Sequence, residues 1–153
     1  MTKDTRWNPD EYRIARRRMV DQQLKKRGIA DPNVLEAMTR VPRHFFVDEA
    51  QALQAYTDSP LPIRYGQTIS QPYIVAVMVD ALHLTPHARV LEIGSGSGYQ
   101  TAILSSLAGA VFAVERPEQA FYKGRANLSH LAFGNPHLKL DDSTLCWTPM
   151  THF

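Results

Sequence analysis

The chain has 153 residues, 44% of them hydrophobic and 21% charged, and this balance excludes disordered and fibrous proteins. Its formal net charge is only +2, and the basic runs 16–18 and 25–27 are typical of solvated helix faces, so we expect no nucleic-acid partner. The sequence shows no apolar run long enough to span a membrane, no secretion signal and a single cysteine, Cys146, which together predict a cytoplasmic protein without disulfides or membrane contacts.

Three helices are predicted in the first half of the chain. Asn8 and Asp31 are good N-cap residues, and each is followed by a proline, which suits the first turn of a helix. Gly28 is a suitable C-cap for the first helix. A third apolar pattern with helical spacing follows an extended segment over 59–62, and Ser70 lies at or just before its N-terminus. The expected helices cover residues 8–28, 32–41 and 74–82.

Beyond Pro86, short apolar strands alternate with helices. This alternation predicts an α/β domain with a parallel sheet. Gly109 and Gly134 fall where the two helices of this part need C-caps. We therefore divide the chain into a helical segment, 1–85, and an α/β segment, 86–153. The expected strands are 89–93, 111–115 and 137–140, and the expected helices are 99–107 and 117–131.

The first of these strands runs into a glycine loop, residues 94–98, which is followed by a helix. Small residues let a ligand approach the backbone there, and the first N–H groups of the helix are free to bind it. A nucleotide-like cofactor fits such a loop, although similar loops also occur as simple tight turns. The spacing is G-x-G-x-G, which differs from the G-x-G-x-x-G of dinucleotide-binding proteins.

Two acidic residues strengthen the nucleotide interpretation. Glu115 ends the second strand, where a carboxylate can accept hydrogen bonds from a ribose diol; alone, it would be only an exposed strand end. Glu92 lies inside the first strand, between Leu91 and Ile93, which we expect to be buried. We therefore expect its carboxylate to face an ammonium group of the cofactor or an N–H group of the loop.

At this point the sequence resembles a known family. The segments 90–100 (VLEIGSGSGYQ) and 114–115 are similar to the first two cofactor motifs of class I S-adenosylmethionine-dependent methyltransferases. The segments 66–76 (GQTISQPYIVA) and 41–47 (VPRHFFV) resemble signature segments of the protein-L-isoaspartate O-methyltransferases. The resemblance implies a helical segment on the substrate side, followed by the first half of a Rossmann-like sheet with about three parallel strands. It also implies methyl transfer from S-adenosylmethionine to isoaspartyl carboxylates of damaged proteins.

The resemblance also assigns roles to individual residues. The glycine loop would hold the methionine part of S-adenosylmethionine, and Glu115 would bind the ribose hydroxyls. Asp142 aligns with the aspartate of a Gly-Asp-Gly motif that lies beside adenine, but both glycines are replaced here, so we expect a weakened adenine contact. The residues expected to bind this cofactor are Thr68, Glu92, Gly94, Ser95, Gly96, Gly98, Glu115 and Asp142.

Ser70 matches the active-site serine of that family. An isoaspartyl carboxylate is already ionised at neutral pH, its reference pKa being about 3.9, so the reaction requires no general base. Ser70 would then orient the acceptor carboxylate by donating a hydrogen bond to it. The alternative role for Ser70 is to cap the helix that follows it. No metal is expected, because the six histidines show no metal-ligand spacing.

The sequence stops at Phe153, where members of that family continue with further strands of the sheet. We therefore expect a truncated sheet whose first strand lacks its second neighbour, and exposed strand edges invite pairing. Three outcomes are expected: the chain is unstable, it dimerises or exchanges elements to cover this edge, or its N-terminal helices fold over the edge. An alternative function follows from the same expectation: a non-catalytic relative that binds S-adenosylmethionine weakly or serves as an interaction module.

Overall fold

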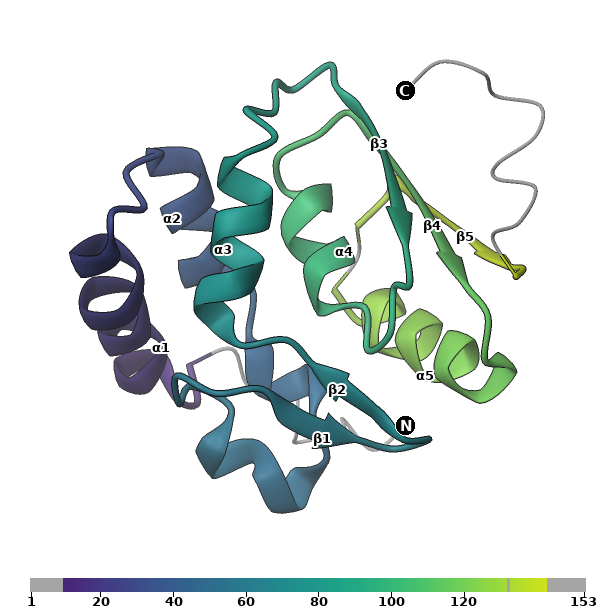
Figure 1. Ribbon diagram of the computed structural model, residues 1–153, viewed down its shortest axis with the longest axis horizontal. Helices are drawn as coiled ribbons and strands as arrows, with labels where there is room; N and C mark the ends of the chain where they lie inside the picture. The colour runs from purple at the N-terminus through teal and green to yellow at the C-terminus, as the bar shows by residue number, and fades with distance from the viewer. Residues whose placement is uncertain (1–9, 132, 143–153) are drawn as a thin grey trace.

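The structure is a computed structural model that describes residues 10–131 and 133–142. Figure 1 shows a helical part on one side and a sheet on the other, with α4 between them. The helical part consists of α1 (Arg13–Met19), the π-helical turn η1 (Val20–Leu24), the 3₁₀ turn η2 (Lys25–Arg27), α2 (Pro32–Arg40), the 3₁₀ turns η3 (Arg43–Phe46) and η4 (Glu49–Gln54), the strands β1 (Leu61–Ile63) and β2 (Gln67–Ile69), and α3 (Pro72–Asp80). The second part consists of β3 (Arg89–Ile93), α4 (Tyr99–Ser105), β4 (Ala110–Glu115), α5 (Glu118–Ser129) and β5 (Pro136–Leu140).

The three strands of the second part form a parallel sheet in the order β3-β4-β5. The predicted architecture, N-terminal helices followed by three parallel strands, is confirmed. Ile93 pairs with Val114 and Glu115 pairs with Leu140, so the carboxyl ends of the strands lie side by side. Within the described residues β3 pairs with β4 alone, which leaves β3 at the edge of the sheet.

The first helix begins later than predicted. Asn8 and Pro9 lie outside the described residues, and the chain makes a turn before α1 starts at Arg13. Tyr12, the residue before the helix, has a left-handed backbone (φ 57°), and its ring packs against the ring of His44 at 4.8 Å between centroids. This ring contact accompanies the non-helical turn at Tyr12. The predicted end at Gly28 is confirmed, because Gly28 has φ 97° and caps η2.

The other two helices of this part start as predicted. Asp31 caps α2, its side chain accepting hydrogen bonds from the N–H groups of Asn33 (2.8 Å) and Val34 (3.4 Å). The N-cap of α3 is Gln71, and this helix has no side-chain cap hydrogen bond. The alternative role of Ser70 as a helix cap is therefore wrong.

The segment over 59–62 is extended, as expected, but it also contributes to an antiparallel hairpin that was not predicted. Leu61 pairs with Ile69 and Ile63 pairs with Gln67. The turn between the strands uses left-handed conformations at Tyr65 (φ 68°) and Gly66 (φ 69°). The hairpin leads directly into Ser70 and α3 (Figure 1).

Gly109 and Gly134 do not have the left-handed conformation of helix C-caps. A Cβ atom on Gly109 would lie 2.7 Å from the carbonyl oxygen of Pro86, and the Gly109 N–H donates to the Ala88 carbonyl at 2.9 Å. Close packing of two chain segments, and not a special dihedral angle, therefore explains the glycine at position 109.

The hydrophobic core extends through both parts of the chain. Its fully buried apolar side chains include Met19, Leu24, Met38, Ile103, Leu104 and Val111. Because both parts share this core, the boundary at residue 86 does not separate two cores, and the division of the chain into two segments there stays a prediction.

Two arginines are also buried in this interior. Arg16 was predicted on a solvated face, which is wrong: its Nε donates to the Thr39 carbonyl at 2.7 Å. Arg43 is fully buried, donates from Nε to the Ala55 carbonyl at 2.7 Å and lies over the Tyr99 ring. Long arginine stems and tertiary hydrogen-bond partners make such burial feasible, and neither is visible in a charge pattern.

Candidate active site

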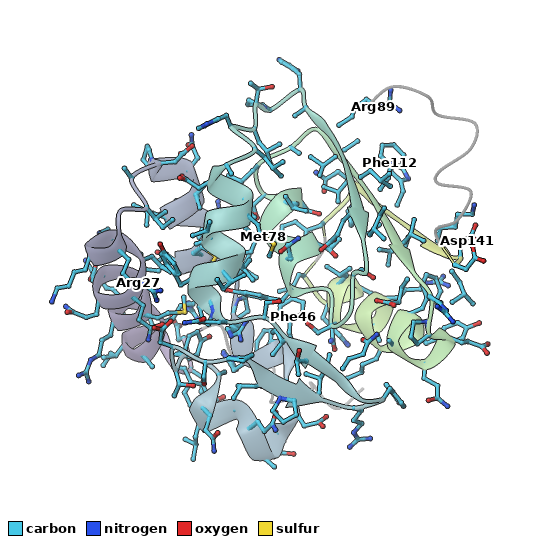
Figure 2. The ribbon with its side chains drawn as sticks, viewed as in Figure 1. Arg27, Phe46, Met78, Arg89, Phe112 and Asp141 are labelled. Atoms are coloured by element: carbon cyan, nitrogen blue, oxygen red, sulfur yellow. The ribbon has the colours of Figure 1, made fainter. Side chains whose placement is uncertain are left out.

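The candidate site lies at the carboxyl edge of the sheet. The N–H groups of Gly94 and Ser95 donate to the carbonyl of Val114, at 2.8 and 3.2 Å, so the glycine loop folds back onto β4. The Asp141 N–H donates to the Glu115 carbonyl at 3.0 Å. Figure 2 shows Asp141 at the tip of β5. The loop after β3 and the acidic ends of β4 and β5 are thus brought to one edge, as the sequence predicted for these segments.

The glycine loop depends on backbone conformations that side chains disfavour. Gly94, Gly96 and Gly98 have φ values of 84°, 52° and 86°. Gly98 is also the N-cap of α4. The loop therefore presents backbone without β-carbons at every second position, directly before a helix N-terminus.

Helix α5 packs against the glycine loop. A Cβ atom on Gly124 would lie 2.7 Å from the carbonyl oxygen of Gly96, so only glycine fits this contact. The Asn127 side chain donates from Nδ2 to the Ser97 carbonyl at 3.0 Å. Both supporting residues were missed from the sequence. The available signal was Gly124 itself, because a glycine inside a helix costs about 1 kcal/mol relative to alanine and needs a packing reason.

Glu115 holds the loop from the side of β4. Its Oε2 accepts a hydrogen bond from the Gly96 N–H at 2.5 Å, and its Oε1 accepts one from the Arg116 N–H at 2.9 Å. Glu115 is buried. Because a carboxylate offers about four lone-pair positions, acceptor capacity remains after these two bonds. The binding of ribose hydroxyls by Glu115 stays a prediction.

Glu92 is buried, but its surroundings differ from those predicted. Ile93 is 61% exposed, whereas Val90 and Glu92 are the buried residues of β3. Ile93 points to the opposite face of β3 from Glu92, because neighbouring side chains of a strand alternate between faces. The Glu92 carboxylate accepts a hydrogen bond from the Thr101 hydroxyl at 2.5 Å, so it faces α4 and not an N–H group of the loop.

The burial of Glu92 also changes its acidity. Removal from water raises the pKa of Glu92 to about 7; the hydrogen bond from Thr101 opposes this shift, and the negative charge of Glu115 adds to it. Glu92 thus titrates near neutral pH. One hydrogen bond connects it to α4, the helix that follows the glycine loop.

The upstream signature segment approaches the loop through Gln67. Its Oε1 lies 3.8 Å from the position that a Cβ atom on Gly96 would occupy. Thr68 is exposed and, by the alternation of a strand, points to the opposite face of β2. The sequence suggested Thr68 as a cofactor residue, whereas Gln67 is the residue of β2 that the structure places beside the loop. The assignment of Thr68 stays a prediction.

Ser70 is exposed at the junction of β2 and α3, and contacts of the neighbouring residues hold this junction in place. The Gln71 side chain donates from Nε2 to Oδ1 of Asp58 at 2.6 Å. Asp58 also forms an ion pair with Arg27 (2.9 Å), and the Arg27 guanidinium lies over the ring of Tyr73. Three segments therefore position Ser70 together: the end of the first helical region, the chain near Asp58 and the start of α3.

Asp142 is exposed just beyond β5, and its N–H donates to Oδ1 of Asp141 at 2.7 Å. Asp141 also pairs with Lys139 at 2.5 Å. Ser143, the last residue of the altered adenine motif, lies outside the described residues. The contact of Asp142 with adenine stays a prediction.

No group of three or more histidine, cysteine, aspartate or glutamate residues is placed to hold a metal ion within 10–131 and 133–142. In the same part of the chain, no helix combines the length and the apolar character needed to cross a membrane.

Comparison with known proteins gives a consistent set of relatives. The family model for protein-L-isoaspartate(D-aspartate) O-methyltransferase (PCMT) matches residues 15–153. The protein-L-isoaspartate O-methyltransferase of Syntrophus aciditrophicus is 51% identical over 144 residues, which cover 94% of this chain and 66% of the relative. The enzyme of the same name from Geobacter metallireducens is 52% identical over 136 residues, which cover 89% of this chain and 63% of the relative. The chain thus spans slightly less than two thirds of the length of these relatives.

Solved structures agree with the sequence relatives. A structure of a protein-L-isoaspartate O-methyltransferase superposes with a TM-score of 0.74 at 28% identity, covering 83% of this chain and 42% of the other. A beta-aspartate methyltransferase from Plasmodium falciparum, solved in complex with S-adenosyl-L-homocysteine, gives a TM-score of 0.69 at 27% identity, covering 82% of this chain and 62% of the other.

Proposed function

Since this chain belongs to the protein-L-isoaspartate(D-aspartate) O-methyltransferase family, we propose that it transfers a methyl group from S-adenosylmethionine to the carboxylate of isoaspartyl residues in damaged proteins. The observation that carries the proposal is the convergence, at one sheet edge, of the left-handed glycine loop, Glu115 and the hairpin that leads to Ser70. The same elements carry the sequence motifs that resemble the family.

The residues at this edge fit S-adenosylmethionine. Gly94, Gly96 and Gly98 leave the backbone of the loop accessible, and Glu115 retains acceptor capacity for a ribose diol. Asp142 follows β5, where it would face adenine. When bound, this cofactor supplies a methyl group on a positively charged sulfur. The protein's own task is to place an acceptor carboxylate in line with that group.

Ser70 performs this placement in the proposed mechanism. Its exposed hydroxyl forms no cap hydrogen bond with α3, which leaves it available to an acceptor carboxylate. The acceptor carboxylate is ionised at neutral pH, so Ser70 need not remove a proton. It donates a hydrogen bond that fixes the direction of the carboxylate, and alignment of two bound reactants is itself a large contribution to rate.

Substitution of Ser70 by alanine tests the function. The full chain is incubated with methyl-labelled S-adenosylmethionine and an isoaspartyl peptide. Loss of a hydrogen bond to a charged group, about 1.5–3 kcal/mol, should lower kcat/KM for Ser70→Ala by roughly 10- to 100-fold. Ser129→Ala removes an exposed serine hydroxyl on α5 and should retain full activity.

Two results would contradict the catalytic proposal. The first is methyl transfer by the wild-type chain that does not exceed transfer by Ser70→Ala. The second is transfer to normal aspartyl peptides at the same rate. Binding of S-adenosylmethionine without any turnover would instead favour the non-catalytic module, a candidate that the edge position of β3 supports.

We also propose that a second copy of the chain covers the exposed edge of β3. An edge strand offers unpaired backbone donors and acceptors, and Ile93 adds an apolar side chain that is 61% exposed. A further exposed apolar stripe is formed by Ile74, Val77 and Met78 on α3 and by Leu82 just beyond it; Met78 is labelled in Figure 2. Light scattering should detect dimers that Ile93→Lys shifts towards monomers. A monomer at all concentrations contradicts the pairing.

We propose the cytoplasm as the place of action. The sequence carries a single cysteine, so no intramolecular disulfide can stabilise the fold, and a reducing compartment suits such a chain. Fractionation of cells that express the tagged full-length protein would test this location.

A further inference from the structure

We propose that the side-chain oxygen of Gln67 accepts a hydrogen bond from the α-ammonium group of S-adenosylmethionine. The inference rests on the proposed function, because it assumes that this cofactor occupies the loop. It adds a cofactor-binding residue outside the glycine loop, contributed by the hairpin of the helical part.

The position of Gln67 is set by the hairpin. Gln67 pairs with Ile63 at the turn end of the hairpin, next to the left-handed residues Tyr65 and Gly66. Ile69, which points to the same face of β2, is buried in the core and holds the strand in place. Gln67 is therefore directed at the glycine loop, where its Oε1 lies 3.8 Å from the position of a Cβ atom on Gly96.

The Gln67 oxygen has no donor in the described part of the chain. Oε1 is buried and forms no hydrogen bond. Four N–H groups of the loop are already engaged elsewhere: Gly94 and Ser95 donate to Val114, Gly96 donates to Glu115, and Gly98 donates to the Ser95 carbonyl. A buried acceptor without a donor is unfavourable and calls for an explanation. A donor that arrives with a ligand supplies one.

The chemistry of the cofactor selects the ammonium group as that donor. S-adenosylmethionine carries N–H or O–H donors only on its adenine amine, its ribose hydroxyls and its α-ammonium group. In the proposed orientation, Asp142 after β5 meets adenine and Glu115 at the end of β4 meets ribose. The remaining end of the cofactor then reaches the loop after β3, beside Gln67. A hydrogen bond from a charged donor is the strong kind that offsets such burial.

This contact would also link cofactor binding to the placement of the acceptor. Gln67 and Ser70 belong to one short segment, β2 and the residue after it, and Ile69 between them is fixed in the core. A cofactor bound to Gln67 therefore contacts the same fixed segment that positions Ser70. Gln67 acts on the cofactor directly and on the acceptor only through this segment.

The test measures the affinity of two ligands for the full chain by calorimetric titration. The ligands are S-adenosylhomocysteine and its analogue without the α-amino group, S-adenosyl-4-thiobutanoate. Gln67→Met keeps the size of the side chain but removes the amide. We expect it to weaken binding of S-adenosylhomocysteine by roughly 10-fold or more and binding of the analogue by less than about 2-fold.

Gln51→Met is the matched control. Gln51 also has a buried Oε1 without a hydrogen bond, but it lies on η4, and the variant should bind both ligands as the wild type does. Thermal unfolding verifies that each variant is folded. Equal weakening of both ligands in Gln67→Met, or no weakening of either, overturns the assignment to the ammonium group. If the wild-type chain binds neither ligand, the proposed cofactor itself is wrong, and the role of Gln67 falls with it.

Discussion

Replacing Gly124 by alanine is expected to destabilise the protein by about 2 kcal/mol, because the added methyl group must displace the glycine loop or bend α5. The new Cβ atom would lie 2.7 Å from the carbonyl oxygen of Gly96, a distance that packed atoms do not tolerate. Displacement of the loop should also weaken binding of S-adenosylhomocysteine by at least roughly 10-fold, since the loop must match its ligand closely. Urea unfolding and calorimetric titration measure the two effects.

Gly134→Ala is the matched control for this prediction. Gly134 does not have a left-handed backbone, and a Cβ atom there would meet nothing within 4 Å. Alanine at this position should change stability by less than about 1 kcal/mol and can even stabilise, because it restricts the unfolded chain. If Gly124→Ala and Gly134→Ala behave alike, the contact between α5 and the loop is not the constraint described above.

Glu92 is expected to make the stability of the wild-type protein fall as the pH rises from about 5 to 8. Its pKa is raised from 4.5 to about 7 in the folded state, so the folded protein binds the proton more tightly than the unfolded chain. The corresponding stabilisation is complete below the unfolded pKa and is lost as the pH rises through the folded pKa. Glu92→Gln carries no titrating group, and its stability relative to the wild type should increase by about 3 kcal/mol across this range.

Urea unfolding at several pH values between 5 and 8 measures this effect. Glu118→Gln serves as the control, because it neutralises an exposed carboxylate at the start of α5 and should leave the pH profile like that of the wild type. Parallel pH profiles for Glu92→Gln and the wild type would show that Glu92 is ionised in the folded state throughout this range, as it is in the unfolded chain, and would contradict the prediction. The structural basis of the prediction is the burial of Glu92 against Thr101.

Local signals in the sequence were sufficient for most of the secondary structure. Asp31 before Pro32 marked the start of α2, and Gly28 marked the end of the first helical region, because capping and backbone preferences act within a few residues. The strands of the sheet were placed within one residue of their ends, since short apolar runs between helices leave few alternatives. The hairpin was missed because its short strands contain prolines and polar residues and gain their order from the core beneath Ile69.

The sequence by itself singled out the glycine loop and Glu115 by residue type and spacing, and Ser70 by its resemblance to the family's signature segment; the roles of these residues stay predictions. The tertiary structure alone decided which side chains complete the site. Gln67 reaches the loop across the hairpin, Gly124 and Asn127 support it from α5, and Glu92 turns to Thr101. Such contacts join residues that are distant in sequence. The pattern of residues along the chain does not show which surfaces meet when helices and strands pack.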